Sequence, residues 1–142
     1  MTTNLQPLEN LIKSGGLKRE PPDQQEFDGL VSSARRQLRD ADVEGLSDEG
    51  RFSFLYGAAH ALGVAALRWH GYRSGKRYLV FQSLQHTANF EASQWRVLNA
   101  CHRQRNLAEY EGHFEVSSQL LAELAEVTQD LLARVEAFGP VP

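Results

Sequence analysis

The sequence predicts an all-α protein, an antiparallel up-and-down bundle of four to five helices. Residues 52–69 are apolar on nearly every side, which is typical of a helix buried by its own bundle or by a second subunit. Nothing in the chain alternates between apolar and polar residues as a half-buried strand would. The clearest amphipathic period runs through Val116, Leu120, Leu121, Leu124, Val127, Leu131, Val135 and Phe138.

The N-terminal part predicts a short helix and a linker. An amphipathic segment over residues 5–13 ends at a pair of glycines. Pro21 and Pro22 follow, and two prolines cannot lie inside a helix. We therefore divide the chain into a short helix with a Pro-rich linker at 1–22 and a helical domain at 23–142.

Capping and breaking residues predict where the longer helices begin and end. A serine or aspartate before an apolar run accepts hydrogen bonds from the first free backbone N–H groups, and glycine or proline ends a helix. A shorter helix is expected over 78–86. In chain order the predicted caps and stops are Asp23 with Glu26, Ser47, Asn89 or Ser93, Gly112 and Pro140.

Composition excludes several classes of protein. The 142 residues contain one cysteine, Cys101, so neither an internal disulfide framework nor a multi-cysteine zinc site is expected. Cys101 falls on an apolar stripe, which predicts a buried, inert thiol. No apolar run approaches the ~20 residues that span a bilayer, and the N-terminus lacks a signal-peptide pattern. We expect a cytoplasmic protein that does not contact a membrane.

The net charge of −3 hides an uneven distribution. Residues 50–108 contain eight basic side chains and one acidic side chain, whereas 1–49 and 109–142 carry net charges of −4 and −6. A middle segment this basic suggests a surface for nucleic acid or a nucleotide. Neutralisation by the acidic helices packed beside it would explain the pattern equally well.

The densest group of functional side chains lies at 102–111. Arg105 shares a helix face with His102 and Glu109, while Asn106 and Tyr110 lie on the adjoining row. An arginine at the edge of an apolar stripe is costly unless it is paired or lines a cleft. Two interpretations remain open, an ion pair between Arg105 and Glu109 or a ligand-binding site.

Several kinds of chemistry find no support in the sequence. A di-metal carboxylate bundle needs Glu-x-x-His pairs on two helices, and the chain has none. The phosphate-binding loop of nucleotide hydrolases is absent as well. We expect no metal and no cofactor. A metal-independent ribonuclease site remains conceivable, in which arginine stabilises charge while histidine moves protons.

Three segments carry a family resemblance. They are Ala34-Arg35-Arg36-Gln37-Leu38-Arg39-Asp40-Ala41, the helix over 52–71 with its end Arg68-Trp69-His70-Gly71-Tyr72-Arg73, and Arg105-Asn106-Leu107-Ala108-Glu109-Tyr110. Over about residues 23–138 the chain resembles a HEPN-superfamily domain, particularly an uncharacterised bacterial branch with the motif Arg-Asn-x-x-Glu-Tyr. The resemblance implies an up-and-down bundle that dimerises through its motif-bearing helices. Many members are metal-independent ribonucleases in toxin–antitoxin, phage-defence or RNA-processing systems, and others only bind nucleotides or RNA.

The ribonuclease motif of that superfamily is an arginine, a polar residue, and a histidine after four to six intervening residues. Arg105 and Asn106 match its first half, but Tyr110 occupies the histidine position and His113 lies after seven residues. Tyrosine has a pKa near ~10 and is a poor proton acceptor at neutral pH. The motif therefore predicts phosphate binding rather than acid–base chemistry.

From these residues and the resemblance we expect a homodimer that binds RNA, a nucleotide or a nucleotidyltransferase-type partner protein. Arg103 and Arg105, with Glu109 beside them, form the expected phosphate-binding site, and Asn106 and Tyr110 position the phosphate.

Two alternatives come from other functional classes. The first is a metal-independent endoribonuclease that uses Arg105 with His102 or His113. The second is a non-catalytic structural dimerisation module in which the pair between Arg105 and Glu109 only stabilises the dimer.

Overall fold

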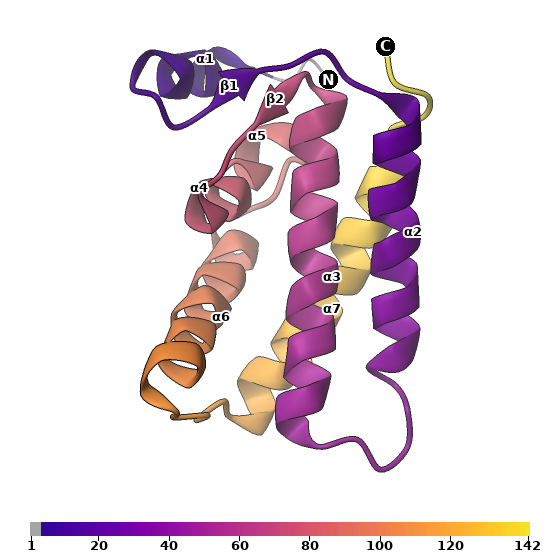
Figure 1. The fold of residues 1–142 in the computed structure, drawn as a ribbon, viewed down its shortest axis with the longest axis vertical. Coiled ribbons are helices and arrows are strands. Elements are labelled where there is room, and N and C mark those ends of the chain that lie inside the picture. Colours follow the sequence, from indigo (N-terminus) through magenta and orange to yellow (C-terminus); the bar gives the residue numbers. More distant parts are fainter. Residues whose placement is uncertain (1–3) are drawn as a thin grey trace.

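The computed structural model describes residues 4–142, and it confirms the all-α bundle (Figure 1). The chain passes down one long helix and up the next twice, so that neighbours in sequence are antiparallel. The long helices are α2 (Gln24–Asp40), α3 (Asp48–Trp69), α6 (Ala92–Glu111) and α7 (Ser118–Glu136), and the short ones are α1 (Gln6–Lys13), α4 (Arg77–Gln82) and α5 (Leu84–Thr87). Across residues 4–142, no helix is both long and apolar enough to cross a membrane.

Helix α3 is the axis of the molecule. It contacts α2 most extensively and also packs against α4, α5, α6 and α7. Ala58, Leu62 and Ala65 on this helix are completely buried. The apolar circumference of residues 52–69 is thus covered within a single chain, which answers one question that the sequence left open.

Some of the predicted caps are confirmed. The Ser47 hydroxyl accepts a hydrogen bond from the backbone N–H of Gly50 at 3.0 Å, and Gly112 ends α6 in the left-handed conformation at φ +70°. Asp23 caps α2 by accepting from the N–H of Gln25. These positions confirm that local capping chemistry determines where the helices begin and end.

Two details of the predicted caps are wrong. Glu26 does not complete a capping box with Asp23, because its carboxylate binds the buried Arg68 and the partly exposed Arg73 instead. Helix α6 is capped by neither Asn89 nor Ser93. Glu91 occupies the cap, and the Gln94 side chain reaches back to the Glu91 N–H at 3.0 Å.

The segment expected to be a linker is partly ordered as a strand. Two antiparallel strands, β1 (Lys18–Arg19) and β2 (Tyr72–Arg73), form a small sheet that the sequence did not indicate. A strand of two residues is too short to leave an alternating pattern in the sequence. Leu8 and Leu17 are buried in a second apolar cluster with residues of α3 and α4, which holds α1 against the bundle.

A buried arginine joins the sheet to the bundle. Arg68 is 2% exposed, and its guanidinium contacts the carboxylate of Glu26 and that of Glu20 at 3.3 Å. It also donates to the carbonyl oxygens of Glu20 at 2.9 Å and Pro21 at 2.7 Å. Arg73 binds the same two carboxylates at 2.6 and 2.7 Å. Two arginines and two glutamates therefore form a closed network.

Because of this network, the stability of the fold decreases at acid pH. Hydrogen bonding from Arg73 lowers the pKa of Glu20, and the two arginines lower the pKa of Glu26 although burial acts in the opposite direction. A carboxylate whose pKa is lower in the folded chain stabilises the fold above its unfolded pKa. That stabilisation is lost as the pH falls through the lowered value.

We predict that Arg68→Met lowers the free energy of unfolding by roughly 3–5 kcal/mol, because it removes one of the two arginines that pair with Glu26 and leaves the carbonyl groups of Glu20 and Pro21 without their donor. Urea denaturation measures the loss. The matched control is Arg35→Met, since the Arg35–Glu136 pair is largely exposed and worth about 0–1 kcal/mol. Equal losses in the two variants would contradict a structural role for Arg68.

Candidate functional site

Helix α6 directs three of the predicted residues toward the bundle. His102, Arg105 and Asn106 lie on the side of α6 that faces α3 and α4, and all three are half-buried. Their spacing of about one helical turn explains this, since residues three and four apart on a helix share a face. The sequence correctly grouped these side chains, although it did not indicate what they face.

They face Tyr56, a buried tyrosine of α3. The Arg105 guanidinium carbon lies 5.7 Å from the centroid of the Tyr56 ring, and that of Arg77, at the start of α4, lies 5.8 Å from it. Both distances are within the range of attraction between a cation and an aromatic ring. Two permanent positive charges from two different helices thus converge on a single ring.

His102 connects the Tyr56 hydroxyl to Asn106. Its Nδ1 lies 3.1 Å from the Tyr56 hydroxyl oxygen and its Nε2 lies 3.4 Å from the Asn106 amide nitrogen. An amide nitrogen only donates, so Nε2 accepts and Nδ1 carries the proton. This pattern requires a neutral imidazole that donates to Tyr56.

The electrostatics of the site agree with a neutral His102. Burial lowers its pKa, and the charges of Arg105 and Arg77 lower it further. The same causes reduce the pKa of nearby His60 to about 4. Burial also raises the pKa of Tyr56. Near neutral pH the site therefore combines neutral proton-bearing groups with two arginines that remain charged.

The two arginines differ in their partners. Arg105 forms an ion pair with Glu109 at 2.9 Å, which confirms the helix pair anticipated from the sequence. Across residues 4–142, Arg77 has no carboxylate within 4 Å. Because Glu109 is negative, it competes with a phosphate for Arg105 rather than binding one. An anion bound by both arginines would balance the charge of Arg77 and displace Glu109 from Arg105.

Open space lies beside Arg105. A hollow of about 250 Å³ separates the end of α6 from the start of α3. Its lining residues are Glu49, Phe52, Ser53, Arg105, Ala108, Glu109 and Phe114. The hollow gives solvent access to Arg105, but Glu49 and Glu109 also line it, so an anion that enters must displace Glu109 from Arg105.

The remaining predicted residues lie elsewhere. Arg103 and Tyr110 are on the outer face of α6, where Tyr110 is 78% exposed, and they border a shallow hollow of about 480 Å³ with Asn106. His113 is exposed in the loop after α6. Arg103, Tyr110 and His113 are thus separate from the group around Tyr56, and Asn106 alone belongs to both surfaces.

Sequence reasoning missed two members of the site. Tyr56 lies on the apolar helix over 52–69, and nothing in the sequence marks its hydroxyl as the partner of His102. Arg77 is one of the eight basic side chains of residues 50–108. The excess of unpaired positive charge in residues 50–108 was the one available signal, and it does not specify which side chains meet.

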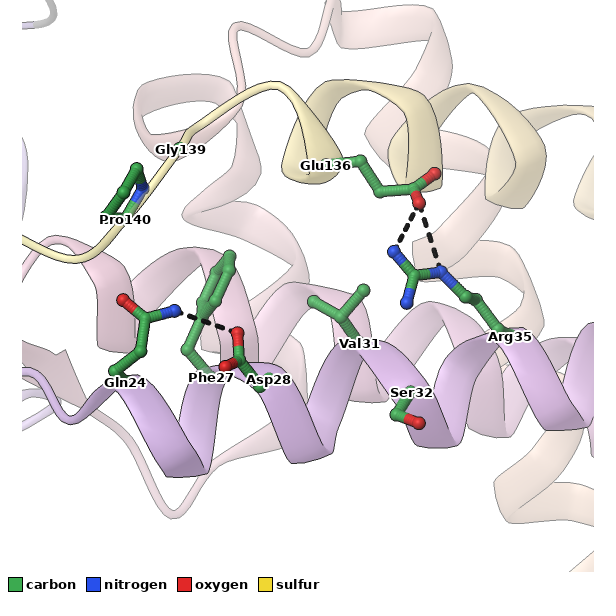
Figure 2. A pocket seen from close by; sticks show the side chains of 9 residues that line it. All are labelled: Gln24, Phe27, Asp28, Val31, Ser32, Arg35, Glu136, Gly139 and Pro140. Carbon is green, nitrogen blue, oxygen red and sulfur yellow. Dashed lines mark hydrogen bonds and ion pairs between the residues drawn. The ribbon is translucent and has the colours of Figure 1, made fainter.

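Another hollow, of about 540 Å³, lies between α2 and the end of α7 (Figure 2). Figure 2 shows the Phe27 ring and Val31 along its floor, with the Arg35 and Glu136 side chains pointing toward each other at one side. None of the predicted functional residues lines it.

Neither a metal site nor a relative adds to this description. Within residues 4–142, no three side chains of histidine, cysteine, aspartate or glutamate gather to hold a metal ion. Comparison of the chain with protein-family models, with curated proteins and with solved structures found no match.

We predict that Arg77→Ala raises the pKa of His102, and that of His60 with it, because one of the positive charges that oppose protonation is removed. NMR titration of the imidazole signals measures both values. Arg96→Ala, an exposed residue of the same basic segment, serves as the control and leaves them unchanged. Identical titrations in all three proteins would show that Arg77 does not act on the site.

Proposed function

We propose that this chain is a HEPN-like helical domain that binds the phosphate group of RNA or of a nucleotide. The observation that supports it most is the convergence of Arg77 and Arg105 on Tyr56. The two positive charges repel each other, and the Glu109 carboxylate compensates only Arg105. Phosphate is well suited because guanidinium groups bind its oxygens with charge-assisted hydrogen bonds.

The side chains have distinct roles in this proposal. Arg105 and Arg77 bind the phosphate oxygens, and Asn106 offers an amide beside them. Tyr56 and His102 hold the two helices in register through their hydrogen bond. Glu109 forms an ion pair with Arg105 when no ligand is present, and a bound phosphate displaces it.

We predict opposite effects from the two members of the ion pair. Arg105→Ala or Arg77→Ala removes a charge-assisted contact worth roughly 1.5–3 kcal/mol and weakens binding of a fluorescent RNA at least tenfold. Glu109→Gln strengthens binding, because the competitor loses its charge while its shape is kept. Fluorescence anisotropy measures all three affinities.

Arg96→Ala controls for a general loss of positive charge and leaves the affinity within about twofold. If the pair between Arg105 and Glu109 only stabilises the structure, Glu109→Gln lowers the melting temperature and does not alter RNA affinity. That result would favour the structural module over the binding domain.

A metal-independent endoribonuclease is the second candidate, and the position of His102 favours it over His113. Its imidazole is neutral, adjoins Arg105 through the shared face of α6, and is oriented by Tyr56. The Nε2 lone pair of a neutral His102 can accept the proton of an attacking 2′-hydroxyl once the Asn106 amide releases it, while arginine stabilises the phosphorane charge. Cleavage of RNA in the presence of a metal chelator that His102→Ala abolishes, and His113→Ala does not, would establish this activity.

The homodimer is proposed on the outer face of α6. Leu107 and Tyr110 expose apolar surface there, at 39% and 78%. Arg103 and Glu111 flank Leu107 at equal spacing on the same helical stripe. If two α6 helices cross antiparallel about Leu107, Arg103 of each copy meets Glu111 of the other. This self-complementarity is what a two-fold interface requires.

We predict a mass of about twice the 16.0 kDa of one chain in light scattering at micromolar concentration. Leu107→Glu places two negative charges at the symmetry axis and returns the protein to the monomer. Val43→Glu is the matched control, since Val43 is also an exposed apolar residue but lies between α2 and α3. A wild-type mass of about 16 kDa would refute the dimer.

A nucleotidyltransferase-type partner protein, a role in toxin–antitoxin or defence systems and a cytoplasmic location complete the proposal. The partner and the biological role rest on the family resemblance, and the location rests on the single cysteine and the lack of a signal-peptide pattern. Co-purification of this chain with such a partner after joint expression tests the first of them.

A further inference from the structure

A second basic surface lies at residues 15–18 and 73–76, outside the site predicted from the sequence. The turn after α1 and the loop after β2 enclose a hollow of about 500 Å³, within the range of ligand pockets. Its lining residues are Gly15, Gly16, Lys18, Arg73, Ser74, Gly75 and Lys76. Three of these are cationic and none is acidic.

The two lysines are the free charges of this hollow. Arg73 is neutralised by Glu20 and Glu26, as described above. Lys18 and Lys76 are exposed, and neither has a carboxylate within 4 Å in the part of the chain from residue 4 to 142. The sheet register sets Lys18 opposite Arg73, so that Lys18 and Lys76 border the same hollow.

The walls of the hollow are held in place. The Ser74 hydroxyl donates to the Gly16 carbonyl at 2.9 Å and accepts from the Lys76 N–H at 3.1 Å, which ties the two loops together. Gly16 packs against Leu79 so closely that a Cβ would lie 2.7 Å from its methyl carbon. The lysines are thus presented by a fixed backbone rather than by free loops.

Lys76 and Arg77 connect this hollow to the site at Tyr56. They are adjacent in sequence, with Cα atoms ~3.8 Å apart, yet Lys76 lines the hollow while Arg77 reaches the Tyr56 ring. The hollow shares no lining residue with the space beside Arg105, so two phosphates of one chain suit the two sites better than a single phosphate.

We propose that the hollow around Lys18 and Lys76 is a second phosphate site, and that the ligand is a single-stranded phosphodiester chain such as RNA rather than a lone nucleotide. The inference rests on the proposed function, because the first phosphate is the one held by Arg77 and Arg105. Lys18 and Lys76 bind a neighbouring phosphate of the same strand. A mononucleotide occupies only the first site.

The test compares ligand lengths in the full chain. The double variant Lys18→Ala/Lys76→Ala is measured by anisotropy and calorimetry against a 12-nucleotide oligouridylate and against uridine 5′-monophosphate. Affinity for the oligonucleotide is expected to fall about tenfold, and the slope of log affinity against log salt by about 1.4, since each single-strand phosphate contact contributes roughly 0.7. Affinity for the monophosphate is expected to stay within about twofold. Oligothymidylate loses affinity by the same factor, because lysine recognises the charge.

A matched variant, Arg36→Ala/Arg39→Ala, removes two exposed charges from α2 and leaves both affinities unchanged. Oligonucleotide binding that requires Arg77 and Arg105 but not the lysines would overturn this inference and leave the proposed function standing. In the double lysine variant, a loss of monophosphate affinity as large as the loss of oligonucleotide affinity would also overturn it. An equally large loss of affinity for polyglutamate, a polyanion without phosphate, would overturn it too. If the wild-type protein binds neither nucleotide ligand, the proposed function fails as well.

Discussion

The buried guanidinium of Arg68 determines how the end of the bundle that carries the small sheet is assembled. A charge removed from water is tolerated only where opposite charge and hydrogen-bond acceptors surround it. Glu26, at the start of α2, and the backbone of residues 20–21 provide them. The N-terminal segment, α2, α3 and β2 therefore meet at one point, and the loop that follows β2 starts from a fixed position.

That fixed start matters for the proposed site, because the loop leads directly into Lys76 and Arg77. Arg77 reaches Tyr56 from α4, whereas Arg105 reaches it from α6. The buried ring of Tyr56, held on the central helix, gives both cations a common surface. The position of the charges thus follows from the packing of three helices and does not depend on any single loop conformation.

Features that depend on one helix were predictable from the sequence, and features that join helices were not. The pair between Arg105 and Glu109, the caps at Ser47 and Gly112 and the buried thiol of Cys101 follow from local spacing. The contact between Tyr56 and His102 does not, because periodicity identifies the buried face of a helix but not the face it meets.

The same limit explains why the capping box failed. Glu26 has the correct spacing for a local partner, but two arginines that lie more than forty residues away hold its carboxylate more strongly. A charge-assisted bond to a buried arginine is stronger than a bond to one backbone N–H. Sequence patterns indicate a local partner such as the backbone N–H, but not a partner on a distant segment of the chain.

Helix α6 is the least anchored of the long helices, since Leu98 and Cys101 are its only buried residues, and both lie in its first half. Local unfolding free energies are lowest where few apolar contacts are buried. The C-terminal turns of α6, which carry Arg105 and Asn106, therefore open more readily than α3 beside them. A ligand that bridges α6 to α4 adds its binding free energy to the closed form. Occupancy of the site and order of this helix are consequently coupled.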